Sequence, residues 1–268
     1  MFTQFIALIL VNLKALLRDR ILHAIFAVSF VILLLVPTLS TFSMRQVQEL
    51  SITLTLSATS MALLVSALLL GASAIWRDIE RRYTASVLPL PITRSCYLLS
   101  KFSSCVIFLL LCALVLGIAS AVVIYLSSLQ YPSTVPICWL NIFLAITFDV
   151  LKYILLAAIA VTLSAVSTSF ALPFFGTLAI YFAGSAAQEV FEYISGQYGE
   201  QISPLALSAI KAVYYILPNF AGYDFKVHAV YALPITLDAV LFPVFYSVFY
   251  VSIVLGLGVW LLNRRQLP

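Results

Sequence analysis

Residues 138–166 read CWLNIFLAITFDVLKYILLAAIAVTLSAV, an apolar run in which the only charged side chains are Asp149 and Lys152. A helix needs about 20 mostly apolar residues to cross the hydrocarbon core of a bilayer, and this run is longer. Because lipid offers no hydrogen bonds to an exposed backbone, such a segment must be helical to cross it. The run therefore predicts a transmembrane helix and decides the class of fold.

The whole chain has the composition of a membrane protein. Hydrophobic residues make up 63% of its 268 residues and charged residues 9%, with a mean hydropathy of +1.13. Soluble domains average about 45–50% apolar and about 25% charged residues. This composition excludes a water-soluble enzyme, a disordered tail and a free-standing nucleic-acid-binding protein.

Five more apolar runs accompany the first, so the sequence predicts one all-α polytopic membrane domain with six transmembrane helices. In the fifth run Gln188, Glu189 and Glu192 end the apolar part near Ala187. The predicted spans are residues 21–42, 50–76, 102–126, 138–166, 170–194 and 234–262.

Two segments outside the spans have patterns of their own. Over residues 1–20, apolar residues recur at three- and four-residue steps, which predicts an amphipathic helix in the membrane interface. The alternative is an extension of the first span. Residues 188–233 are too apolar for a plain loop and contain a helix-like stretch broken at Pro218-Asn219. We expect a partly embedded, re-entrant outer segment there.

The basic residues predict an orientation. If the six spans alternate in direction across the membrane, most basic side chains fall on the side that holds both termini. The positive-inside rule makes this side cytoplasmic. That side holds Lys14, Arg18, Arg20, Arg77, Arg81, Arg82, Arg94, Lys101, Arg264 and Arg265, whereas the other holds Arg45, Lys211 and Lys226.

Polar residues inside the spans allow more than one interpretation. Asp149 and Lys152 lie three residues apart, on one helix face. They could form a translocation or ion-coupling site, or a salt bridge that fixes this helix, and the second is favoured because the two charges neutralise each other without a substrate. Ser and Thr residues of the second span are expected to face other helices, a partner copy or a central pathway.

Motifs for catalysis are missing from the sequence. It has no H-E-x-x-H, no G-x-S-x-G, no zinc-like Cys/His spacing and no G-x-x-x-x-G-K-[ST] loop. We expect a chain that is not an enzyme and binds no metal or cofactor. If ATP drives its work, the ATPase must be another polypeptide.

The predicted cytoplasmic loop, residues 77–101, is dense in charge and interrupted by Pro89 and Pro91. Thr93 is placed to cap a helix that leads into the third span. The run Pro91-Ile92-Thr93-Arg94, followed by Leu98-Leu99 and Lys101, resembles the P-x-[ST]-R…LLGK signature of ABC-2 type ABC transporter permeases, especially the small six-helix NosY-like ones.

Two other segments carry the same resemblance. Leu217-Pro218-Asn219-Phe220, followed by Asp224-Phe225-Lys226, is similar to the LPN-type segment before the last helix of that family. The closing run Asn263-Arg264-Arg265-Gln266-Leu267 is similar to its basic R-R-[DQ]-L end. Arg82-Tyr83 stands where the family often has Gly-Thr, and Ser100 stands where it has Gly before the lysine.

The resemblance implies an exporter-type permease subunit in a bacterial cytoplasmic membrane. Two copies would assemble with two copies of a separate ATPase, which would hold ATP and Mg²⁺, and an accessory protein could bind on the outer side. The residues implied in coupling to the ATPase are Glu80, Arg81, Arg82, Pro91, Arg94 and Lys101.

Two other classes of function fit the sequence. An ion-coupled secondary transporter would use Asp149 and Lys152 as its ion or proton site. A membrane assembly factor would transport nothing.

Overall fold

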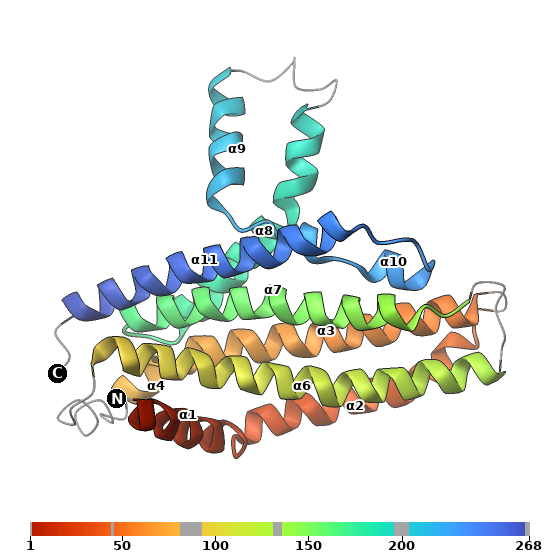
Figure 1. Cartoon of the computed structure of the whole chain (residues 1–268), viewed down its shortest axis with the longest axis horizontal. Coiled ribbons are helices and arrows are strands. Elements are labelled where there is room, and N and C mark those ends of the chain that lie inside the picture. The colour runs from red at the N-terminus through yellow and green to blue at the C-terminus, as the bar shows by residue number, and fades with distance from the viewer. Residues whose placement is uncertain (1, 44–45, 81–92, 131–135, 196–203, 266–268) are drawn as a thin grey trace.

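The computed structural model describes residues 2–43, 46–80, 93–130, 136–195 and 204–265. All regular elements in these ranges are helices (Figure 1). In chain order they are α1 (Phe2–Leu16), α2 (Arg20–Ser40), α3 (Val47–Ser73), α4 (Trp76–Glu80), α6 (Arg94–Gln130), α7 (Trp139–Val166), α8 (Ala171–Ser195), α9 (Pro204–Ile216), the 3₁₀ turn η2 (Ala221–Tyr223), α10 (Lys226–Val230) and α11 (Leu237–Arg264).

Five of the described helices are long and apolar enough to cross a membrane: α2, α3 with its continuation into α4, α6, α7 and α11. The chain is therefore an all-helical integral membrane protein. Helix α8 covers the fifth predicted span but is not among the five, and the polar residues Gln188, Glu189 and Glu192 in its second half shorten its apolar part. The six-span topology stays a prediction.

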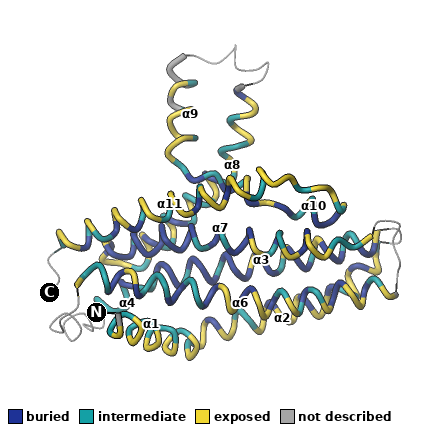
Figure 2. Tube along the Cα trace, viewed as in Figure 1, coloured by how far each residue is buried: buried dark blue, intermediate teal, exposed yellow. Residues whose placement is uncertain are grey.

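Helices α3 and α7 form the centre of the bundle, with α6 and α11 packed against α7 and α2 against α3. Buried residues concentrate on these central helices, whereas α11 and the projecting part of α8 and α9 carry many exposed ones (Figure 2). The wide apolar exposure of α2 and α11 is what a lipid-facing helix requires. The core is thus a helix pair enclosed by other helices.

Part of the hydroxyl stripe of α3 faces other helices, as one of the three expectations for it has it, whereas Thr53 and Ser57 are exposed. Thr59 pairs with Ser120 of α6 at 2.9 Å, and Ser60 with the Tyr153 hydroxyl of α7 at 2.7 Å. Ser51 donates to Ser127 of α6 at 3.1 Å. Hydroxyl pairs of this kind join helices in lipid, where unpaired polar groups are costly.

Small residues let α3 and α7 approach closely. Gly71 of α3 lies so near Ala160 of α7 that an added Cβ would overlap the Ala160 methyl group. On the other side of α7, a Cβ at Gly258 of α11 would lie 2.9 Å from the Thr162 hydroxyl oxygen. Such close contacts stabilise the bundle, because packing rather than water exclusion drives helix association in lipid.

Helix α1 is a separate element rather than an extension of α2. It ends at Leu16, and the Asp19 side chain then accepts a hydrogen bond from the Ile21 N–H at 3.0 Å, which caps the start of α2. Helix α1 packs against α6, where Ser104 donates to the Ile9 carbonyl at 3.3 Å. The predicted helix over 1–20 is thus shorter, and its interfacial position stays a prediction.

Both termini lie at the same end of the bundle, as do α4 and the start of α6 (Figure 1). Helix α8 leaves that end obliquely and projects with α9 beyond the bundle, while η2 and α10 lead to its opposite end (Figure 1). The segment from α8 to α10 thus connects the end of α7 to the start of α11.

Candidate functional site

The candidate site is the base of the segment 81–92, where α4 leads into it and α6 leads out of it. Thr93 caps α6 by accepting from the Cys96 N–H at 3.2 Å, which confirms the predicted cap. Helix α6 begins at Arg94, so the last third of the predicted loop 77–101 belongs to a long helix that continues into the third span.

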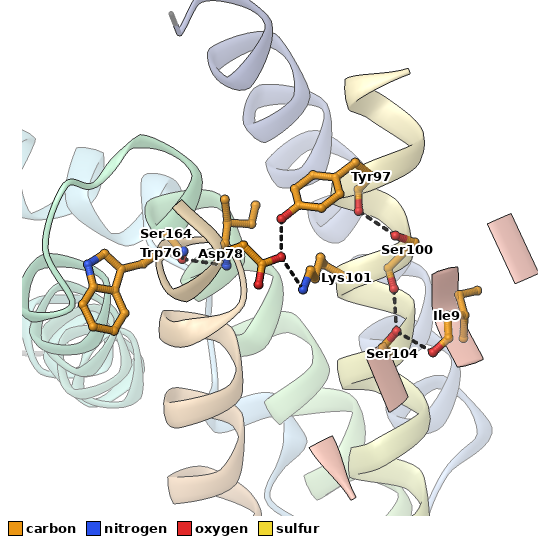
Figure 3. A network of polar contacts seen from close by, with 9 residues as sticks. Ile9, Trp76, Asp78, Tyr97, Ser100, Lys101, Ser104 and Ser164 are labelled. Atoms are coloured by element: carbon orange, nitrogen blue, oxygen red, sulfur yellow. Dashed lines mark hydrogen bonds and ion pairs between the residues drawn. The ribbon is translucent and has the colours of Figure 1, made fainter. Parts of the chain in front are cut away.

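One carboxylate joins the two stems of this segment (Figure 3). Asp78 of α4 lies 2.6 Å from the Lys101 ammonium of α6 and accepts a hydrogen bond from the Tyr97 hydroxyl at 2.5 Å. The side chains of Asp78 and Lys101 are 19% and 15% exposed, so water screens this pair less than a surface pair. These contacts oppose movement of α4 relative to α6.

A serine of α7 holds the junction between α3 and α4. The chain turns after Ser73, and this leaves the N–H groups of Ile75 and Trp76 without helical acceptors. Ser164 Oγ accepts from both, at 3.2 Å and 2.9 Å (Figure 3). It also donates to the Ala72 carbonyl at 2.9 Å. One buried hydroxyl thereby fixes the start of α4 to the end of α7.

A second ion pair connects α4 to the corner between α1 and α2. Arg77 Nη1 donates to Asp19 Oδ2 at 2.7 Å. Partial burial of Asp19 favours its neutral form, but hydrogen bonds from Arg77 and the Ile21 N–H, with the charges of Arg77 and His23, outweigh that effect and lower the pKa of this carboxyl. Asp19 is therefore both the cap of α2 and an anchor for α4.

Two arginines fasten the end of α11. Arg94, at the start of α6, donates through Nη1 to the carbonyls of Leu262 at 2.9 Å and Arg265 at 2.7 Å. Arg265 in turn donates to the Ala165 carbonyl of α7 at 2.7 Å. The last carbonyls of a helix have no helical donors and carry its negative dipole end, so a guanidinium satisfies them well.

The predicted coupling residues fall into three groups. Glu80 is exposed at the end of α4. Arg94 and Lys101 bind other parts of the bundle, so they hold the stems rather than extend outward. Arg81, Arg82 and Pro91 lie outside the described residues. The sequence analysis missed Asp78, Tyr97 and Ser164, although an acidic residue between two predicted helices was a signal for Asp78.

The charge pair of α7 is a second candidate site, away from the first. Lys152 Nζ lies 2.7 Å from Asp149 Oδ1, and the two side chains are 7% and 4% exposed. The pair is not aligned as a hydrogen bond, so its attraction is mainly Coulombic. Lys152 also lies 4.9 Å from the ring centre of Tyr153, whose hydroxyl pairs with Ser60.

The predicted outer segment is held by side-chain hydrogen bonds to its backbone. Asn141 of α7 donates to the carbonyls of His228 and Leu233, both at 2.9 Å. Asn219 donates to Gln188 of α8 at 2.8 Å, beside Gly184, where an added Cβ would overlap the Pro218 carbonyl. Non-helical backbone survives in a membrane protein when other groups bond to it in this way.

No protein-family model matches the chain, and a search of curated proteins finds no significant match.

Proposed function

We propose that the chain is the membrane-spanning permease subunit of an ABC transporter of the ABC-2 type, coupled through residues 77–101 to a separate ATPase. Export across a bacterial cytoplasmic membrane, with two copies of each subunit, belongs to the same proposal. It rests on the resemblance of the loop, LPN and C-terminal motifs.

The observation that carries the proposal is the linkage of both stems of the segment 81–92. Asp78 joins α4 to α6 through Lys101 and Tyr97. Arg77 joins α4 to the corner between α1 and α2, and Ser164 joins it to α7. A partner that displaces the segment would therefore move several helices together.

An ATPase can shift the permease only through contacts that differ between two states of the complex. The exposed Glu80 would contribute to docking in this proposal. Asp78, Tyr97 and Lys101 would transmit the movement into the bundle. Docking and transmission then depend on different residues and can be tested separately.

The test is affinity purification of the tagged chain in mild detergent and in nanodiscs, followed by ATP turnover measurements. We expect an ATPase to copurify, Glu80→Arg to reduce its recovery, and Tyr97→Phe or Lys101→Met to retain it while ATP turnover no longer responds to the permease. Lys14→Gln, an exposed basic residue on α1 outside this network, is the control. Failure to recover any ATPase in all these conditions would overturn the proposal.

The buried pair Asp149–Lys152 supports ion-coupled transport as a second candidate. Ionisable side chains that are 4% and 7% exposed within a spanning helix are unusual, and such residues often mark ion or proton pathways. Proton uptake by proteoliposomes would support this candidate if Asp149→Asn abolished it. Uptake that persists in the variant would exclude the pair as the coupling site.

A further inference from the structure

A cleft opens beside the Asp19–Arg77 pair, between the starts of α2 and α8 and the junction of α3 with α4. Its volume is about 250 Å³. Ile21, Leu22 and Leu69 form part of its apolar wall, and Phe170 lies against Trp76 with ring centres 5.5 Å apart. The cleft is thus lined mostly by apolar side chains, together with the charged pair of Asp19 and Arg77.

The cleft lies at the end of the bundle where spanning helices begin and end. Helix α2 starts at Arg20 and the spanning part of α3 ends next to Trp76. Tryptophan side chains are enriched at this level of membrane proteins, where headgroups meet acyl chains. A molecule in the cleft would therefore meet lipid chains on one side and headgroups on the other.

The corner between α1 and α2, which borders the cleft, carries three basic residues beside the acidic Asp19. Lys14, Arg18 and Arg20 are exposed near the corner between α1 and α2. Arg77 is 35% exposed, and within the described part of the chain it hydrogen-bonds through Nη1 to Asp19. Asp19 is the single acidic residue of the cleft lining, and it positions Arg77. The other guanidinium donors of Arg77 remain for an anionic group.

We propose that this cleft binds one anionic phospholipid, with its phosphate on Arg77 and part of an acyl chain along Leu69 and Phe170. Basic pockets between spanning helices suit anionic headgroups, and each nearby basic side chain adds attraction. Arg18 and Arg20 supply further charge, while the apolar wall selects a lipid over a soluble phosphate. The Arg77–Asp19 pair also belongs to the linkage of α4 described above, but binding of a lipid in this cleft does not require an ATPase.

The test uses delipidated protein in detergent and native mass spectrometry, with dioleoyl phosphatidylglycerol and dioleoyl phosphatidylcholine as probes. We expect phosphatidylglycerol to bind at least about fivefold more tightly, and Arg77→Gln to remove this preference. Leu69→Phe should weaken both lipids because it fills the cleft. Arg264→Gln removes a basic residue that stacks on Trp260 at 4.1 Å, outside the cleft, and should change nothing.

The double variant Arg18→Gln/Arg20→Gln provides a second test in case Arg77→Gln does not fold. Both of its positions are exposed, so we expect it to fold. It should lower phosphatidylglycerol affinity about fivefold or more. Equal binding of the two lipids by the wild-type protein would overturn the proposal. So would unchanged binding in Leu69→Phe, or displacement of the lipid by glycerol phosphate at equal concentration, which would indicate a site for a free anion.

Discussion

At the residue scale, the molecule places few charges inside its helices and pairs those it has. Asp149 and Lys152 are the clearest case, because each is almost fully buried and each is the neighbour that offsets the other's loss of hydration. Their pairing on one helix face was predictable from a spacing of three residues. A role of the pair in transport is tested by proton uptake, whereas its contribution to stability is tested by mutation.

Removing one member of this pair should cost more than removing both. Lys152→Met leaves Asp149 as an uncompensated buried charge, and we expect a loss of about 3–5 kcal/mol. The double variant Asp149→Asn/Lys152→Met should recover most of that loss. Thermal unfolding of the purified variants measures this, and equal losses in the single and double variants would argue against a coupled pair.

The ion pair of Asp19 predicts a pH dependence of stability. Because the folded protein lowers the pKa of Asp19, its stabilising contribution is complete above the unfolded pKa near 3.8 and is lost as pH falls through the lower folded pKa. The stability difference between the wild type and Asp19→Asn should therefore shrink under acid conditions. Thermal midpoints of both proteins, measured at stepped pH, check this, and a difference that grew toward low pH would contradict it.

At the scale of elements, close approach and side-chain hydrogen bonds decide how helices meet. Gly71 permits contact between α3 and α7, and Asn141 bonds to the backbone that connects α10 to α11. Both act between segments far apart in sequence. Each can be tested by a change that leaves the helix itself intact.

Replacing Gly71 should separate the two central helices. We expect Gly71→Ala to destabilise the protein by about 1–3 kcal/mol, because the added methyl group has no space beside Ala160. Gly256 of α11 is the matched control, since an added Cβ there meets nothing within 4 Å. Gly256→Ala should be neutral or mildly stabilising. Similar thermal midpoints for both variants would show that the contact is unimportant.

Replacing Asn141 should loosen the segment before α11. Asn141→Leu leaves the His228 and Leu233 carbonyls without this donor, at a cost of about 1–3 kcal/mol for each carbonyl that stays unsatisfied. Hydrogen exchange should rise in residues 226–236. Thr147→Val on the same helix removes a hydroxyl that bonds only to Phe143 in its own helix, and it should leave this exchange unchanged.

At the scale of the whole molecule, the decisive question is how many times the chain crosses the membrane. Five described helices have the length and apolarity to cross. However, α2 begins and α11 ends at the same end of the bundle (Figure 1). This arrangement favours an even number of crossings, and we propose that α8, η2 and α10 together make the sixth.

Labelling of single cysteines in a variant without Cys96, Cys105, Cys112 and Cys138 tests this topology. We expect Lys14→Cys and Asn263→Cys to react with an impermeant maleimide only after cells are permeabilised. Thr41→Cys, at the opposite end of α2, should react in intact cells. All three positions are exposed. Opposite behaviour of Lys14→Cys and Asn263→Cys would establish an odd number of crossings.

The sequence by itself determined the membrane class, the positions of the long helices and the cap at Thr93. These features depend on composition and on side chains within a few residues of each other, so they are readable along the chain. Helix ends were less certain, as the early start of α6 at Arg94 illustrates.

Only the tertiary structure decided which residues act together. Arg94 and the carbonyl of Leu262, or Ser164 and the N–H of Trp76, are far apart in the sequence and meet because the bundle brings helix ends together. No local pattern encodes such partners, since an arginine or serine can bond to many acceptors. Packing of α3, α6, α7 and α11 selects among them, and thereby determined how the candidate site is built.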